Sequence, residues 1–202
     1  MDISIYQSWI NDRIEELRTA QRIKLEIDRL NGSAWDFVLM GCLVDIISRI
    51  NYNNLNSSLK RTSKLFDDRL PQYREAFYNI PKRINDVPEQ IYMVMRCGLV
   101  HSLSLVPDKN VIDRKPYKDH WRKGSLLLTH RGNHLQMRTR RYNGHLIDAC
   151  QLDYSTMLED MQSALDAIFQ DAEHDTALSA HIEKFVSENP TLGFVSSIPQ
   201  DT

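Results

Sequence analysis

The chain has 202 residues, of which 42% are hydrophobic and 26% are charged, and it holds only 7 glycines and 7 prolines. These values are typical of a folded globular protein and argue against long disordered segments. The formal net charge is −2, no basic stretch followed by an apolar one opens the chain, and no apolar run approaches the roughly 18 residues of a membrane span. We therefore expect a cytoplasmic protein with no membrane contact.

The charges are distributed unevenly along the chain. Residues 114–145 hold nine lysines and arginines and one acid, whereas residues 146–202 hold one lysine and eleven acids. Two interpretations follow from this asymmetry. The basic segment faces a polyanion such as nucleic acid, or it pairs with the acidic C-terminal helix.

The cysteines and the common motifs exclude several classes of protein. Cys42, Cys97 and Cys150 are odd in number and far apart, so we expect reduced thiols and neither a disulfide framework nor a structural zinc site. The chain lacks GxxxxGK[ST], GxGxxG, GxSxG and HExxH. We expect no cofactor and no bound metal.

The first half of the chain predicts helices. Apolar residues recur at helical spacings over residues 3–30, and "AWDFVLMGCLVDIISRI", which follows Ser33, is apolar on nearly all sides and predicts a central buried helix. Residues 57–79 predict a helix broken at Pro71. After a loop rich in proline, a further helix is expected over residues 88–106.

The pattern then changes to short strands. Residues 125–131, 133–142 and 145–152 favour β structure, and the Asn-Gly pair before the third is a strong hairpin signal, so residues 124–152 predict a three-stranded antiparallel meander. Alternation in the strand "HLQMRTR" predicts one polar and basic face, which is either a nucleic-acid-binding surface or merely a solvated one. The residues predicted on that face are His134, Gln136, Arg138 and Arg140.

A last long helix is expected over residues 154–186, with its apolar side at Met157, Met161, Leu165, Ile168 and Phe169. The predicted fold is therefore mostly α. It is an antiparallel helical bundle, a single domain over residues 1–202, with the β-meander inserted before the last long helix, which makes the class α+β.

The helix of residues 88–106 carries an unusual pair of residues. In "YMVMRCGLVHSLSLV", Arg96 and His101 are five positions apart, or about 140° around the helix axis, so they do not share one face. They can act together only in a cleft, most simply where the helix meets its copy in a symmetric homodimer. In the structural alternative, Arg96 is a surface residue and His101 a satisfied histidine.

The stretch "RCGLVH" resembles the arginine, four-to-six-residue gap, histidine motif of HEPN (higher eukaryotes and prokaryotes nucleotide-binding) domains. The resemblance implies a dimeric helical bundle acting as a metal-independent endoribonuclease in a toxin or defence setting, with an antitoxin or regulatory protein as partner. It implies that Arg96 binds the scissile phosphate and His101 moves protons, and it makes the adjacent Cys97 and Ser102 candidates for supporting roles. A HEPN-like module that binds nucleotide, RNA or protein without catalysis is the alternative.

Overall fold

The described part of the chain, in a computed structural model, is mostly helical, as expected. It covers residues 3–28, 34–52, 55–73, 124–129, 132–142 and 145–189. The elements in chain order are α1 (Ile3–Asp28), α2 (Ala34–Asn51), α3 (Ser58–Arg69), β1 (Gly124–Thr129), β2 (Gln136–Tyr142), β3 (His145–Asp153), α8 (Tyr154–Ala172) and α9 (Thr176–Glu188). None of the described helices combines the length and the apolar character that crossing a bilayer requires.

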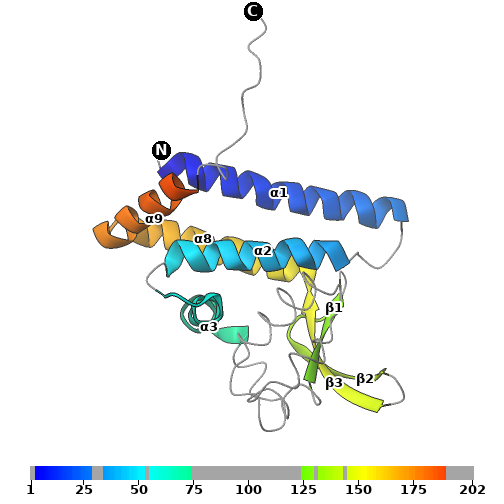
Figure 1. The fold of residues 1–202 in the computed structure, drawn as a ribbon. Helices are drawn as coiled ribbons and strands as arrows, with labels where there is room; N and C mark the ends of the chain where they lie inside the picture. The colour runs from blue at the N-terminus through cyan, green and yellow to red at the C-terminus, as the bar shows by residue number, and fades with distance from the viewer. Residues whose placement is uncertain are drawn as a thin grey trace, which may run out of the picture.

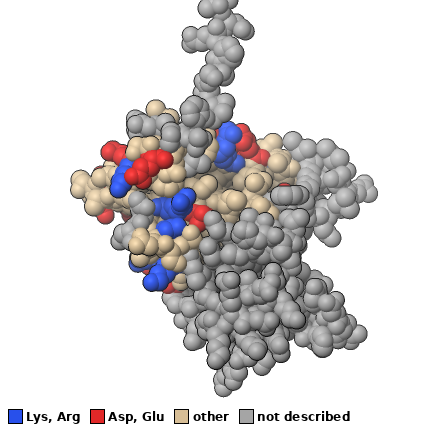
Figure 2. Space-filling model, viewed as in Figure 1, with Lys and Arg blue, Asp and Glu red and all other residues tan. Residues whose placement is uncertain are grey.

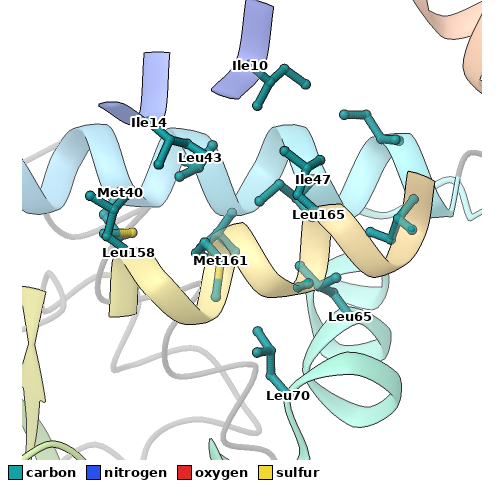
Figure 3. Close-up of a cluster of buried hydrophobic side chains, with 14 of the residues drawn as sticks. Ile10, Ile14, Met40, Leu43, Ile47, Leu65, Leu70, Leu158, Met161 and Leu165 are labelled. Atoms are coloured by element: carbon teal, nitrogen blue, oxygen red, sulfur yellow. The ribbon is translucent and has the colours of Figure 1, made fainter. Parts of the chain in front are cut away.

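Helices α1, α2 and α8 form the centre of the bundle, and α1 runs opposite to the other two (Figure 1). Figure 3 shows their side chains meeting in one apolar cluster, to which α3 adds Leu65 and the residue after α3 adds Leu70. The members labelled from the three central helices are Ile10, Ile14, Met40, Leu43, Ile47, Leu158, Met161 and Leu165. Because each such side chain stabilises the fold by about 1.5–3 kcal/mol when fully buried, this cluster is the main source of stability.

The expected central position of α2 is confirmed, with one qualification. Its residues pack against α3, α8 and α9, and the ring of Phe37 meets Tyr154 of α8 edge to face, with the ring centroids 5.3 Å apart. Leu39 and Cys42 are exposed, however, so one side of this apolar helix is open. The helix is central without being covered all round.

The single helix predicted over residues 154–186 is divided into two helices, α8 and α9. The predicted apolar residues, from Met157 to Phe169, are all buried along α8. The chain then turns at residues 173–175, because the carboxylate of Asp175 accepts hydrogen bonds from the backbone N–H groups of Ala177 and Leu178 and so begins α9. An aspartate in this capping position stabilises a new helix start, which the apolar periodicity alone did not indicate.

The predicted antiparallel meander is wrong in its topology. The strand order is β1-β3-β2, with β2 antiparallel to β3, as a hairpin requires, and β1 parallel to β3. β3 takes the centre of the sheet, and its Cys150 and Leu152 are fully buried in the same core as the helices. β2 lies at an edge of the sheet, where Arg138 is exposed.

Candidate nucleic-acid interface

The predicted catalytic residues lie outside the described part of the chain. Arg96, Cys97, His101 and Ser102, together with the helix predicted over residues 88–106, fall between residue 73 and residue 124. Their roles stay predictions. The residues predicted to contact nucleic acid lie on or beside β2, and the structure separates them into two environments.

Gln136 and Arg138 are both exposed on β2. They are two residues apart in a strand, and Arg140 follows at the same spacing, so the three positions share one side of the sheet. Among the described residues Arg138 forms no ion pair. Its positive charge is therefore available to a phosphate, as the sequence predicts for this strand.

His134 does not belong to that face. β2 begins at Gln136, and Leu135, between the two, has a backbone φ of 57°, which breaks the alternation of the strand. The Leu135 N–H donates to the Gln151 carbonyl at 2.7 Å, so the chain is held against β3 at this point. The His134 side chain consequently turns inward and is only 11% exposed. We correct the prediction: His134 is an inward-facing, partly buried polar residue.

Both ring nitrogens of His134 are engaged. The backbone N–H of Asp153 donates to Nδ1 at 3.0 Å, and from this bond we assign the ring hydrogen to Nε2. Nε2 lies 3.0 Å from the Tyr73 hydroxyl, which donates to Oδ2 of Asp160 at 2.8 Å. The three side chains form one directed chain of hydrogen bonds that engages both ring nitrogens of His134.

Tyr73 is the centre of this network, although no sequence signal indicated it. It lies just after α3, is completely buried, and its ring packs against Phe66 with the ring centroids 5.0 Å apart. Burial, followed by the negative charge of Asp160 and the hydrogen bond to it, raises the pKa of Tyr73 well above its ordinary value near 10. The phenol therefore stays protonated and positions His134 and Asp160.

Asp153 connects the network to the bundle. It is the last residue of β3 and the N-cap of α8, and its carboxylate accepts from both the backbone N–H and the hydroxyl of Thr156. An aspartate directly before a helical pattern is a recognisable cap signal, so sequence reasoning could have found this role. The hydrogen bond between Asp153 and His134, by contrast, joins residues 19 positions apart, so no local sequence pattern indicates it.

A glycine makes room for the chain before His134. Gly132 has a φ of 145°, and a Cβ at this position would lie 2.2 Å from Nε2 of Gln151, whose side chain is almost completely buried. Any other residue would both strain the backbone and displace Gln151. The approach of residues 132–135 to β3 therefore depends on this glycine.

The acidic C-terminal helices form their described contacts elsewhere. Asp171 of α8 pairs with Arg69 of α3 at 2.6 Å, Asp160 bonds to Tyr73, and Glu188 of α9 pairs with Lys184 at 3.7 Å. For Arg138, the interpretation that the basic segment pairs with the acidic helix therefore fails within the described residues.

On the face that Figure 2 draws, the described helices show no large basic area. Figure 2 shows their lysines and arginines next to acids. A pocket of about 490 Å³ between α2, α3 and the start of α9 is lined by Lys64 and Arg69, but these pair with Asp68 and Asp171. Its cations are thus already neutralised, which disfavours it as a phosphate site.

The two described cysteines differ in environment. Cys42 is exposed on α2, whereas Cys150 is buried in β3, and burial raises the pKa of its thiol to about 12. A thiol with such a pKa is not ionised near neutral pH, so Cys150 is a packing residue. No group of three or more histidine, cysteine, aspartate or glutamate side chains is arranged to hold a metal ion in the described ranges.

Comparison with known proteins adds no family: no family model, no curated protein and no solved structure matches this chain.

Proposed function

We propose that this protein is a HEPN-like, metal-independent endoribonuclease that binds the RNA backbone along β2 and cleaves it with Arg96 and His101. The cleavage part of the proposal is supported by the sequence motif "RCGLVH" and by the mostly helical fold. The observation that carries the RNA-binding part is Arg138, which is exposed and forms no ion pair among the described residues.

The positions of the arginines on β2 fit a nucleic-acid backbone better than a site that reads specific bases. Arginine side chains spaced along an extended strand neutralise phosphates, which binds nucleic acid tightly but without reading its bases. By the alternation of the strand, the side of Gln136, Arg138 and Arg140 also includes the position of Tyr142, the last residue of β2. We therefore expect binding that depends strongly on salt and weakly on sequence.

The chemistry needs only an acid, a base and a fixed cation. His101 would take the proton from the 2'-hydroxyl as that oxygen attacks the phosphorus, while Arg96 would stabilise the charge on the phosphorane. The bond from phosphorus to the 5'-oxygen then breaks, and the leaving oxygen takes a proton from the imidazolium of the site. The products are a 2',3'-cyclic phosphate and a free 5'-hydroxyl.

The test is cleavage of RNA, with DNA for comparison, in the presence of EDTA. We expect RNA to be cut to a 2',3'-cyclic phosphate and DNA to remain intact. His101→Ala should lower the rate by about 10² to 10⁴, the usual worth of general acid–base catalysis. His174→Ala, which removes an exposed histidine in the turn before α9, is the matched control and should cleave at the parent rate. Equal cleavage by His101→Ala would refute the catalytic role.

The site as proposed is completed by a second copy of the chain. Arg96 and His101 point to different sides of one helix if residues 88–106 are helical, so the proposal requires a homodimer through that segment. Light scattering should then report about twice 23.6 kDa.

A second candidate is a HEPN-like module that binds RNA or nucleotide without cutting it. One observation favours it: Cys97 follows Arg96, where the resembled motif commonly has a polar residue, and a thiol is a weak hydrogen-bond donor. RNA binding that depends on Arg138, with no metal-free cleavage of single-stranded or structured RNA, would select this candidate.

A further inference from the structure

β2 is an edge strand with both of its faces open near its middle. In the described sheet one side of β2 pairs with β3, and no described strand lies along the other side. The consecutive residues Arg138 and Thr139 are both exposed, although neighbours in a strand point to opposite faces. In Figure 1 this part of the sheet extends away from the helices. An extended segment of another chain could therefore approach the edge without displacing the bundle.

No acid lies directly opposite an arginine of β2 in the register of the ladder. In register, Arg138 is paired with Ala149 and Arg140 with Ile147, while Arg141 is paired with Leu146. The one acid in this stretch of β3, Asp148, is opposite Thr139. Since directly opposite residues form the main cross-strand contacts, the described Arg138 has no carboxylate at the position opposite it in β3. A strand added at the free edge would occupy the equivalent position on the other side.

We propose that the free edge of β2 binds an extended acidic segment of a partner protein as a fourth strand. Its backbone would hydrogen-bond to β2, and its alternate carboxylates would lie beside Arg138 and Arg140. The segment occupies the strand that binds RNA, so it acts as an inhibitor, a consequence that rests on the proposed function. A second copy of this chain is a poor occupant, because two β2 edges would bring arginines together.

The probe is a labelled peptide of about eight residues in which glutamate alternates with valine and threonine. Its affinity for the full chain is measured by fluorescence anisotropy without RNA. Two control peptides separate charge from strand pairing: one carries lysine for glutamate, and the other keeps the glutamates but is N-methylated at alternate residues. We expect the acidic peptide to bind, both controls to bind at least about tenfold more weakly, and the amides of β2 to exchange hydrogen more slowly in the complex.

Arg138→Glu should weaken the acidic peptide roughly tenfold, because an attractive cross-strand pair becomes a repulsive one. Lys60→Glu, the same charge change at an exposed position on α3, is the matched control and should leave the affinity unchanged. Equal binding of the N-methylated peptide, or no binding of the acidic peptide at millimolar concentration, overturns the proposal.

A separate titration with single-stranded RNA distinguishes the two hypotheses. RNA binding without peptide binding leaves the proposed function intact and refutes the proposal that β2 binds an acidic segment as a fourth strand. Peptide binding without RNA binding does the reverse, and the edge is then a protein interface only. If both bind and compete, the inhibitory role follows.

Discussion

His134 and Arg138 are four residues apart in one basic, histidine-containing stretch, yet they lie in opposite kinds of environment. His134 is held by the backbone of Asp153 and the hydroxyl of Tyr73, with little exposure. Arg138 is exposed at the sheet edge and has no ion pair within the described residues. The first residue joins the sheet to the bundle, and the second is available to a ligand.

The comparison teaches that charge and residue type along a sequence do not separate structural from binding residues. The separation comes from the backbone at Leu135, whose positive φ reverses the direction of the side chain before it. A leucine in this conformation is unfavourable by about 1–2 kcal/mol. The surrounding contacts must offset that cost, among them the Leu135 bond to Gln151 and those of His134.

The largest expected difference between the two environments is in stability. Tyr73→Ala removes a fully buried ring and leaves His134 and Asp160 without their common partner, so we expect a loss of about 3–5 kcal/mol in the free energy of unfolding. Arg138→Ala should change it by no more than about 0.5 kcal/mol. Urea unfolding of both variants provides the measurement. Equal losses of stability would mean that Arg138 of β2 matters to the fold as much as the network of Tyr73, His134 and Asp160.

Substitutions of His134 and Arg138 should have opposite effects on stability and on RNA binding. His134→Ala leaves the Asp153 N–H and the Tyr73 hydroxyl short of a partner, which should cost about 1–3 kcal/mol of stability while leaving the affinity for RNA unchanged. Arg138→Ala should retain stability and weaken RNA binding. The dependence of the RNA-binding constant on salt concentration should also weaken, by the amount expected for about one lost phosphate contact. If His134→Ala weakened RNA binding as much as Arg138→Ala does, the inward position of His134 would not describe the protein in solution.

The smallest expected effect is a pH dependence of stability that arises from Tyr73. The folded-state pKa of Tyr73 is raised, so its contribution is complete below the unfolded value near 10 and is lost as the pH rises above it. By pH 11 the unfolded chain gains about 1.4 kcal/mol from ionising this tyrosine, and Tyr73→Phe should remove that part of the decline. Unfolding curves at pH 8 and pH 11 measure it. Parallel declines in parent and variant would assign the alkaline loss to other residues, such as the buried Tyr6 and Tyr154, whose pKa values are also raised by burial.

The helices and the hairpin were predictable because their signals are local. The spacing of Met157, Met161 and Leu165 indicated α8, and the Asn-Gly turn correctly paired β2 with β3, in which Tyr142 is opposite His145. Each of these patterns is contained within a short window of sequence.

The remaining features depend on contacts between distant segments. β1 pairs with β3 in parallel, from Gly124 opposite Asp148 onward, and no turn residue specifies such a pairing. The bond between Tyr73 and Asp160 joins residues 87 positions apart. The inward turn of His134 follows from one backbone angle at Leu135 that no side-chain pattern reports.

The direct passage of β3 into α8 has a mechanical consequence. β3 ends at Asp153 and α8 begins at Tyr154, so no loop lies between the strand and the helix. Asp153 is held on both sides, by Thr156 within the helix and by His134 beside the sheet. Because no flexible loop separates them, a force applied to the hairpin of β2 and β3 is transmitted directly to α8. A force that pulls the edge strand outward is therefore resisted by the core of the bundle.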